Sequence, residues 1–412
     1  MHHFGGFMIP HLAKTHVGLR RKDNQDAVYA DAELGLFLLA DGVGGHLDGD
    51  VAAATAIKTF ENAKPEILAL RQSADTISKN QLRRDALSLL EQLFQRASQA
   101  VFDESERRDQ NGMLTTLVVS FVVKGDLYVG HVGDSRAYLY RNGQLRQVTE
   151  DHSMVNELVK MGRMSLEDAR KSRYRNLITR AIGLKPTVQP DIIYIPILDG
   201  DTILMCSDGL SDPVPEKTIE AALGSQSVEE SAEELFQAAL AKGGPDNIGI
   251  VLFKPSFGTE PARVSSRAQA MDSLFLFRDL NYPERMKLSR ICDDLDFKAG
   301  DILVREDEVG DSLFVITSGK VLVRSGNMSL AELESGQHFG ELGPLEYTSR
   351  SATVEAISEG SVIIIRHESL QEFYAQDPEL GCKILQRMLS TAGNRLRSAN
   401  KKLLSIQRAL NG

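Results

Sequence analysis

Short apolar segments recur along the first 254 residues, and each is bounded by glycine, aspartate or asparagine. They are rich in β-branched and aromatic residues, as buried strands are. They read LGLFLLA (34–40), TTLVVSFVV (115–123), DLYVGHV (126–132), RAYLYRNG (136–143), TILMC (202–206) and NIGIVLF (247–253). The long stretch between the first two has helical character, as in KNQLRRDALSLLEQLFQRASQAVFDES. The pattern predicts a domain of strands and helices over residues 12–254.

The pattern changes after residues 255–272, where proline, glycine and serine occur without periodicity and indicate a linker. From there FKAGDILVREDEVGDSLFVITSGKVLV continues with short strands separated by glycines, which predicts a small β-roll within residues 273–395. Pro378 then suits the first turn of a helix over 378–410. The predicted fold class is therefore α+β.

The C-terminal helix carries an apolar stripe with alternating spacings of four and three residues. Its members are Leu385, Leu389, Ala392, Leu396, Ala399, Leu403, Ile406 and Leu410. This is the a/d pattern of a coiled coil and predicts a homodimer. A helix packed on its own β-roll needs a similar stripe, so that alternative stays open.

Composition narrows the class of protein. A chain of 412 residues with 42% hydrophobic residues is long enough for two cores. The net charge of −10 argues against a nucleic-acid partner. No apolar stretch reaches membrane-spanning length and no secretory signal precedes the domains, so we expect no membrane partner. The three separated cysteines fit a reducing compartment, and we expect a cytoplasmic protein.

Aspartates recur where the apolar segments end or begin. They are Asp41 in LADGVGG, Asp134 in HVGDSR, Asp208 in CSDGL and Asp246 in GPDNIG. Each alone is an ordinary turn signal. If the strand ends meet, carboxylates 4 Å apart repel by about 4 kcal/mol, so the cluster needs cations or protons. Oxygen ligands of this kind suit Mg²⁺ or Mn²⁺, and the glycine after Asp41 would let the Gly42 carbonyl face a metal.

These segments, with GLRRKDNQD and RNLITRAIG, resemble the metal-dependent type 2C serine/threonine protein phosphatases in their bacterial form. The resemblance implies a β-sandwich of two antiparallel sheets flanked by helices. It also implies direct hydrolysis of phosphoserine or phosphothreonine in proteins by metal-activated water, without a protein nucleophile.

The same resemblance implies the roles of individual residues. Asp41 would bridge two metals, with the Gly42 carbonyl on the second and Asp208 and Asp246 on the first. Asp134 would help to hold a third, weaker metal, and Arg21 would bind the phosphate. Asp26, Gln25 and Asn247 would lie around the ligands and support their water molecules.

Two positions depart from the family pattern. The family often has glutamate in place of Gln25, so metal affinity is expected to be lower. The animal enzymes have a histidine in place of Val43; His46 is nearby, and the general acid stays unassigned.

The stretch FGELGPLEYTSRSATV (339–354) combines a Gly-Glu pair with an arginine nine residues after the glutamate. It resembles the phosphate-binding cassette of cyclic-nucleotide-binding domains. Gly340 and Glu341 would then meet the ribose, and Arg350 and Ser351 the cyclic phosphate, with cyclic AMP expected over cyclic GMP. Pro344 removes a backbone donor from the cassette.

The leading hypothesis is a phosphatase regulated by a cyclic nucleotide. One alternative is a catalytically silent, nucleotide-responsive scaffold, which retention of the aspartates and Arg21 disfavours. The other is an active phosphatase whose β-roll only docks partners.

The coiled-coil stripe generates a direct prediction. Leu396→Glu places a charge on the stripe and should convert a dimer into a monomer, because a charged side chain at such a position is costly to desolvate. Sedimentation of the variant and the unmodified chain measures this. Equal monomeric masses for both would contradict the dimer.

Overall fold

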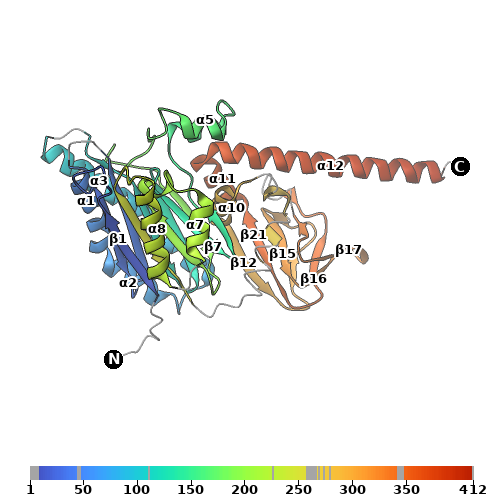
Figure 1. Ribbon diagram of the computed structural model, residues 1–412. Coiled ribbons are helices and arrows are strands. Elements are labelled where there is room, and N and C mark those ends of the chain that lie inside the picture. Colours follow the sequence, from blue (N-terminus) through green and yellow to red (C-terminus); the bar gives the residue numbers. More distant parts are fainter. Residues whose placement is uncertain are drawn as a thin grey trace. The chain divides into compact units, whose positions relative to one another are not determined.

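Figure 1 shows the computed structural model of the chain. It describes residues 9–43, 48–109, 112–224, 227–256, 267, 270–271, 274–277, 280–340 and 348–410. The chain divides into two compact units, Met1–Pro261 and Ala262–Gly412. Each unit has hydrophobic cores of its own. The predicted limits of the domains and of the linker stay predictions.

The first unit is a sandwich of two antiparallel sheets, with strand orders β2-β3-β5-β6-β9 and β1-β11-β10-β7-β8, and β4 attached to β3. The strands are β1 (His11–His16), β2 (Asp26–Asp31), β3 (Leu36–Val43), β4 (Leu114–Thr115), β5 (Leu117–Val123), β6 (Asp126–Val132), β7 (Arg136–Arg141), β8 (Gln144–Gln147), β9 (Asp191–Pro196), β10 (Thr202–Cys206) and β11 (Ile248–Phe253). The sheets meet face to face where Phe37 stacks on Phe253, with ring centroids 4.0 Å apart.

Helices cover both outer faces of the sandwich (Figure 1). Their bounds are α1 (Gly49–Asn62), α2 (Lys64–Ser73), α3 (Lys79–Arg107), α4 (Met154–Lys160), α5 (Leu166–Lys171), α6 (Asp208–Ser211), α7 (Glu216–Leu223) and α8 (Val228–Ala241). One core joins α1, α2 and α3 to the sheet of β3, and another joins α7 and α8 to the sheet of β10. The predicted β-sandwich flanked by helices is confirmed.

The six predicted apolar strands all form, and β3 continues through Asp41 to Val43 instead of ending at the aspartate. Strands β1, β2, β8 and β9 were not predicted from the sequence. In β1, β2 and β8 no more than one residue is buried, so these strands lack the continuous apolar run that marks the central ones.

The second unit is the predicted β-roll. Its sheets have the orders β12-β21-β15-β18, β13-β20-β16-β17 and β14-β19. The strands are β12 (Cys292–Phe297), β13 (Ile302–Val304), β14 (Val309–Gly310), β15 (Ser312–Ser318), β16 (Lys320–Ser325), β17 (Met328–Glu334), β18 (His338–Phe339), β19 (Thr348–Ser349), β20 (Thr353–Ala356) and β21 (Gly360–Arg366). The 3-10 helix η1 (Phe275–Phe277) and helices α10 (Tyr282–Ser289), α11 (His367–Gln376) and α12 (Pro378–Leu410) complete it.

Helix α12 is a single helix of 33 residues. Its first turns pack on the core of their own unit through Leu380, Ile384 and Met388. Leu385 and Leu389 of the predicted stripe are 40% and 73% exposed. The side chains of the stripe from Ala392 onward lie outside the described residues. No described helix is both long and apolar enough to cross a membrane.

Close packing between α3 and the sheet depends on Gly130 of β6. A Cβ atom at this position would lie 2.3 Å from Phe94 Cε2 and 2.9 Å from Leu90 Cδ2, both on α3. The glycine therefore lets the helix approach the strand more closely than any side chain would permit.

Gly130→Ala should lower the free energy of unfolding of the first unit by about 1–3 kcal/mol, because the added methyl group overpacks this contact. Calorimetry should show a lower melting temperature for the transition of that unit. Gly393→Ala is the matched control. Its methyl group would lie 3.8 Å from the nearest neighbouring atom, Arg397 Nη2, and would therefore cause no clash. An unchanged transition in Gly130→Ala would contradict this account.

Candidate functional site

The predicted acidic residues meet at one end of the sandwich. Asp41 lies on β3, Asp208 is the first residue of α6 directly after β10, Asp246 precedes β11, and Asp134 lies in the turn between β6 and β7. A direct bond ties the two sheets together here, because Ser207 Oγ donates to Asp26 Oδ2 at 2.7 Å. Asp26 on β2 is also the register partner of Asp41 on β3.

The negative charges of this cluster act on one another. Burial raises the pKa of Asp41 well above its usual range, and the charges of Asp26 and Asp208 raise it further. Burial likewise raises the pKa of Asp208, together with the charges of Asp134 and Asp246. The structure therefore gathers these five aspartates into one cluster of interacting charges.

Asp26 is the most deeply buried member, with 7% of its surface exposed. Burial raises its pKa to about 7, and the hydrogen bond from Ser207 opposes this shift. No N–H or O–H of the described residues donates to Asp26 Oδ1. Because Asp26 and Asp41 are register partners on paired strands, their neighbouring carboxyl groups favour uptake of a proton or a cation.

Asp134 lies beside a second charged pair. Arg136 holds Asp151 in a bidentate ion pair, with Nε to Oδ1 at 2.8 Å and Nη2 to Oδ2 at 2.6 Å. Burial and the charge of Asp151 raise the pKa of Asp134 to about 7. Because the Arg136 guanidinium is already paired with Asp151, it neutralises little of the negative charge of Asp134.

Gly42 follows Asp41 on β3, and its N–H donates to the Gln25 carbonyl at 3.1 Å. A Cβ atom on Gly42 would lie 2.2 Å from the carbonyl oxygen of Gly49, the first residue of α1. The backbones of the helix and the strand thus touch, which no side chain at position 42 would allow. A Cβ atom on Gly49 would in turn lie 2.9 Å from Gln25 Cδ and 3.0 Å from the Gly42 carbonyl carbon.

Arg21 lies at the edge of the cluster and donates to Asp246 Oδ2 at 2.7 Å. Its side chain is 46% exposed, against 30% for Asp246. The hydrogen bond to Asp246 raises the pKa of Arg21 above its already high value. The guanidinium is therefore charged, partly solvated and close to the carboxylates.

Asn247 holds backbone segments together at this edge. Its Nδ2 donates to the carbonyls of Val17 at 2.9 Å and Asp23 at 3.0 Å. Its Oδ1 accepts from the Gln25 N–H at 2.9 Å. The sequence predicted that Asn247 belongs to the site, but these backbone contacts have no sequence signature.

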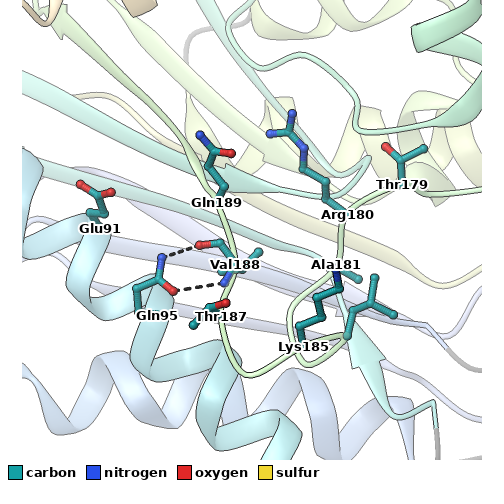
Figure 2. A pocket seen from close by; sticks show the side chains of 10 residues that line it. Glu91, Gln95, Thr179, Arg180, Ala181, Lys185, Thr187, Val188 and Gln189 are labelled. Atoms are coloured by element: carbon teal, nitrogen blue, oxygen red, sulfur yellow. Dashed lines mark hydrogen bonds between the residues drawn. The ribbon is translucent and has the colours of Figure 1, made fainter. Parts of the chain in front are cut away.

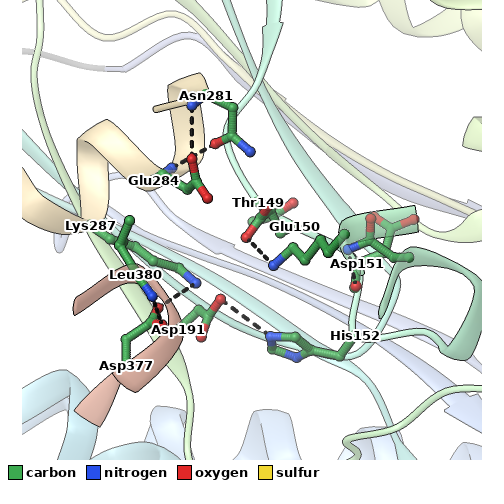
Figure 3. A network of polar contacts seen from close by, with 12 residues as sticks. Thr149, Glu150, Asp151, His152, Asp191, Asn281, Glu284, Lys287, Asp377 and Leu380 are labelled. Atoms are coloured by element: carbon green, nitrogen blue, oxygen red, sulfur yellow. Dashed lines mark hydrogen bonds and ion pairs between the residues drawn. The ribbon is translucent and has the colours of Figure 1, made fainter. Parts of the chain in front are cut away.

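Other polar groups that support the site were not identified from the sequence. Thr116 Oγ1 accepts from the Asp41 N–H at 3.1 Å, and the Thr116 N–H donates to the Asp41 carbonyl at 2.8 Å. The turn before Asp134 is held by His152, whose Nδ1 lies 3.2 Å from the Gly133 nitrogen. The other ring nitrogen, Nε2, lies 3.3 Å from Asp191 Oδ2 (Figure 3).

The donor set fits a hard divalent cation. As the side chains stand, no group of three or more His, Cys, Asp or Glu residues in the described part of the chain is arranged to hold a metal ion. Arg21 occupies one oxygen of Asp246, while Asp26 Oδ1 accepts no hydrogen bond from a described residue. Clustered carboxylate and carbonyl oxygens without sulfur suit Mg²⁺ or Mn²⁺. His46 lies outside the described residues.

A cavity of about 550 Å³ lies elsewhere in the first unit, between α3 and the loop 179–189 (Figure 2). Gln95 holds that loop against α3, because its Oε1 accepts a hydrogen bond from the Val188 N–H at 3.1 Å. The cavity lining includes Glu91, Arg180 and Lys185 but none of the predicted site residues. Because both acidic and basic side chains line the cavity, its charge favours no particular class of ligand.

In the second unit, Arg350 is turned toward main-chain oxygens. Nη2 donates to the Ser312 carbonyl at 2.9 Å, and Nη1 lies 3.5 Å from the Gly340 carbonyl. Arg350 forms no ion pair with a described residue, and burial lowers its pKa. A Cβ atom on Gly310 would overlap its guanidinium.

Other parts of the predicted nucleotide site are described less fully. Gly340 has a φ of +75°, in the region that favours glycine. Ser351 is exposed beside Arg350. Glu341 and Pro344 lie outside the described residues.

Residues 35–248 match the Protein phosphatase 2C family, and residues 294–377 match the Cyclic nucleotide-binding domain family. The serine/threonine phosphatase stp of Listeria welshimeri is 39% identical over 232 residues, which cover 56% of this chain and 85% of that protein.

Two solved structures are similar to the first unit. The serine/threonine phosphatase PstP of Mycobacterium tuberculosis aligns with a TM-score of 0.53 at 37% identity, over 60% of this chain and 98% of that one. The catalytic domain of PstP in complex with two manganese ions aligns with a TM-score of 0.52 at 36% identity, over 60% of this chain and 97% of that one.

Asp208→Asn should weaken Mn²⁺ binding at least about tenfold, because it removes a charge that a divalent cation would neutralise. Titration calorimetry with MnCl₂ alone measures this without any substrate. Asp103→Asn on the exposed face of α3 is the matched control and should bind Mn²⁺ as the unmodified chain does. Equal affinities for all three proteins would contradict the metal site.

Proposed function

Because the chain belongs to the protein phosphatase 2C family and is a metal-dependent serine/threonine protein phosphatase, we propose that its aspartate cluster holds two Mn²⁺ or Mg²⁺ ions for the hydrolysis of protein phosphoesters. We further propose that a cyclic nucleotide at the β-roll regulates this activity. The observation that carries the proposal is the gathering of Asp41, Asp208 and Asp246 at one end of the sandwich, with too little cationic charge beside them.

The ligand roles are those that the resemblance to the family implies for these positions. Asp41 would be shared between two ions, with the Gly42 carbonyl on one and Asp208 and Asp246 on the other. Asp134, which lies toward Asp151, would contribute to a third, weaker site. When bound, such cations make water a better nucleophile at neutral pH and stabilise the charge of the phosphoryl group.

The side chains of the chain itself bind and orient the substrate. Arg21 has a planar fork of donors that fits two phosphate oxygens, and its partial exposure lets it exchange Asp246 for a phosphate. Ser207 and the strand register hold Asp26 against Asp41. Asp26 would thereby orient water near the reacting phosphorus, with Gln25 and Asn247 supporting the same side.

The β-roll supports a nucleotide site through Arg350. Its guanidinium is held by carbonyl oxygens and by no described carboxylate, so a cyclic phosphate would supply the missing negative charge. Ser351 would add a donor to that phosphate, while Gly340 and Glu341 would face the ribose. Cyclic AMP is the expected ligand over cyclic GMP.

We also propose limits for the domains, a class of substrate and a homodimer. The phosphatase domain would span residues 12–254 and the nucleotide domain residues 273–395, joined by the linker 255–272. Phosphorylated proteins would be the substrates, and α12 would mediate a homodimer. A β-roll that only docks partners is the alternative to nucleotide regulation; a silent scaffold is disfavoured by family membership.

Hydrolysis of a phosphothreonine peptide with Mn²⁺, with and without cyclic AMP or cyclic GMP, tests both proposals. We expect turnover that depends on Mn²⁺ and changes when cyclic AMP is added. Excess EDTA should abolish turnover, because the aspartates alone cannot activate water. Turnover that survives chelation of all metal would contradict the metal-dependent mechanism.

Arg350→Gln should lower the affinity for cyclic AMP about tenfold or more and remove its effect on turnover, because a charged phosphate contact is lost. Calorimetry with cyclic AMP alone provides the binding readout. Arg324→Gln, which removes an arginine paired with Glu355 elsewhere on the β-roll, is the control. If neither the unmodified chain nor the control binds cyclic AMP or cyclic GMP, nucleotide regulation is contradicted. The alternative of a β-roll that only docks partners then stands.

A further inference from the structure

The loop that carries Arg21 exposes five consecutive residues, 19–23, next to the aspartate cluster. Leu19 is 61% exposed, and Arg20, Arg21 and Lys22 are all exposed. Arg21 alone of these cations is tied to the cluster, through Asp246. Arg20 and Lys22 form no ion pair with a residue in the described ranges.

The shape of this loop is fixed by the backbone. At its start Gly18 has a φ of +81°, and a Cβ atom there would lie 2.2 Å from the Asp246 carbonyl oxygen. The Leu19 N–H then donates to the Gly244 carbonyl at 2.8 Å. The Asn247 amide bonds both Val17 before the loop and Asp23 after it. A loop held at both ends presents its side chains without a large ordering cost on binding.

The charge of the loop contrasts with that of the chain. Three cations stand against the single carboxylate of Asp23, in a protein whose net charge is −10. Arg20 and Lys22 adjoin Arg21 in the chain, so flanking residues of a substrate whose phosphate reaches Arg21 would come near their exposed side chains. Carboxylates in that segment would meet unpaired positive charge, whereas basic residues would be repelled.

We propose that the loop 19–22 determines substrate specificity by binding acidic residues that flank the phosphorylated residue of a protein. This inference rests on the proposed function and adds to it the chemical class of the preferred substrate. Arg20 and Lys22 bind the flanking carboxylates, while Arg21 binds the phosphate. The contacts are exposed, so they act mainly on substrate binding and weaken as salt is added.

The test uses two phosphothreonine peptides of equal length, flanked on both sides by aspartates in one and by asparagines in the other. With Mn²⁺ at low ionic strength, the unmodified protein should show a kcat/KM roughly tenfold higher for the aspartate peptide, because each exposed charge pair contributes a factor of about two to five. The difference should lie in KM and should disappear at about 0.5 M NaCl, where the screening length falls to a few ångströms.

Arg20→Gln/Lys22→Gln should reduce this preference to about twofold or less. The control Lys217→Gln/Lys298→Gln removes the same number of exposed charges from α7 and from the second unit, and should keep the preference intact. Thermal unfolding of both variants confirms that they are folded.

The outcomes separate this inference from the proposed function. If both peptides are hydrolysed but the aspartate peptide is not preferred, only the inference is overturned. The same holds if Arg20→Gln/Lys22→Gln leaves the preference unchanged. An equal loss in the control would also overturn it, because net charge would then be the cause. Hydrolysis of neither peptide would overturn the proposed function and this inference together.

Discussion

Mutual repulsion among buried carboxylates is the constraint on which the first unit depends. Asp26 and Asp41 are held in contact by strand register, and Asp208 and Asp246 reach the same volume from the opposite sheet. The stacked rings of Phe37 and Phe253 hold those two sheets together. Hydrophobic burial thus supplies the free energy that keeps like charges close, and divalent cations would relieve the repulsion.

The same arrangement explains why the backbone is so closely packed around the cluster. Gly42 and Gly49 touch main chain to main chain, and Thr116 bonds both backbone groups of Asp41. These contacts leave the Asp41 peptide little freedom to move. Because these groups are already held in place, the protein spends no reorganisation energy when charge develops in the site during a reaction.

Much of the fold was predictable because its central strands are buried on both sides and read as continuous apolar runs. Strands β1, β2 and β8 were missed because most of their residues are half-buried or exposed. Asp41, Asp134, Asp208 and Asp246 were identified because each stands at the border of an apolar run, whereas Asp26 came from the family resemblance. Ser207, Thr116 and His152 were missed because their contacts join segments far apart in sequence, and a single serine, threonine or histidine carries no pattern.

The bond between Arg21 and Asp246 has a thermodynamic consequence. While it exists, the arginine neutralises a carboxylate that a cation would otherwise use. Transfer of the guanidinium to an incoming phosphate would free that carboxylate, so occupancy of the proposed phosphate site would favour occupancy of the proposed metal site, and the converse would hold with the same coupling free energy. One half-exposed side chain would thereby make the phosphoprotein and the metal cooperative ligands of this enzyme.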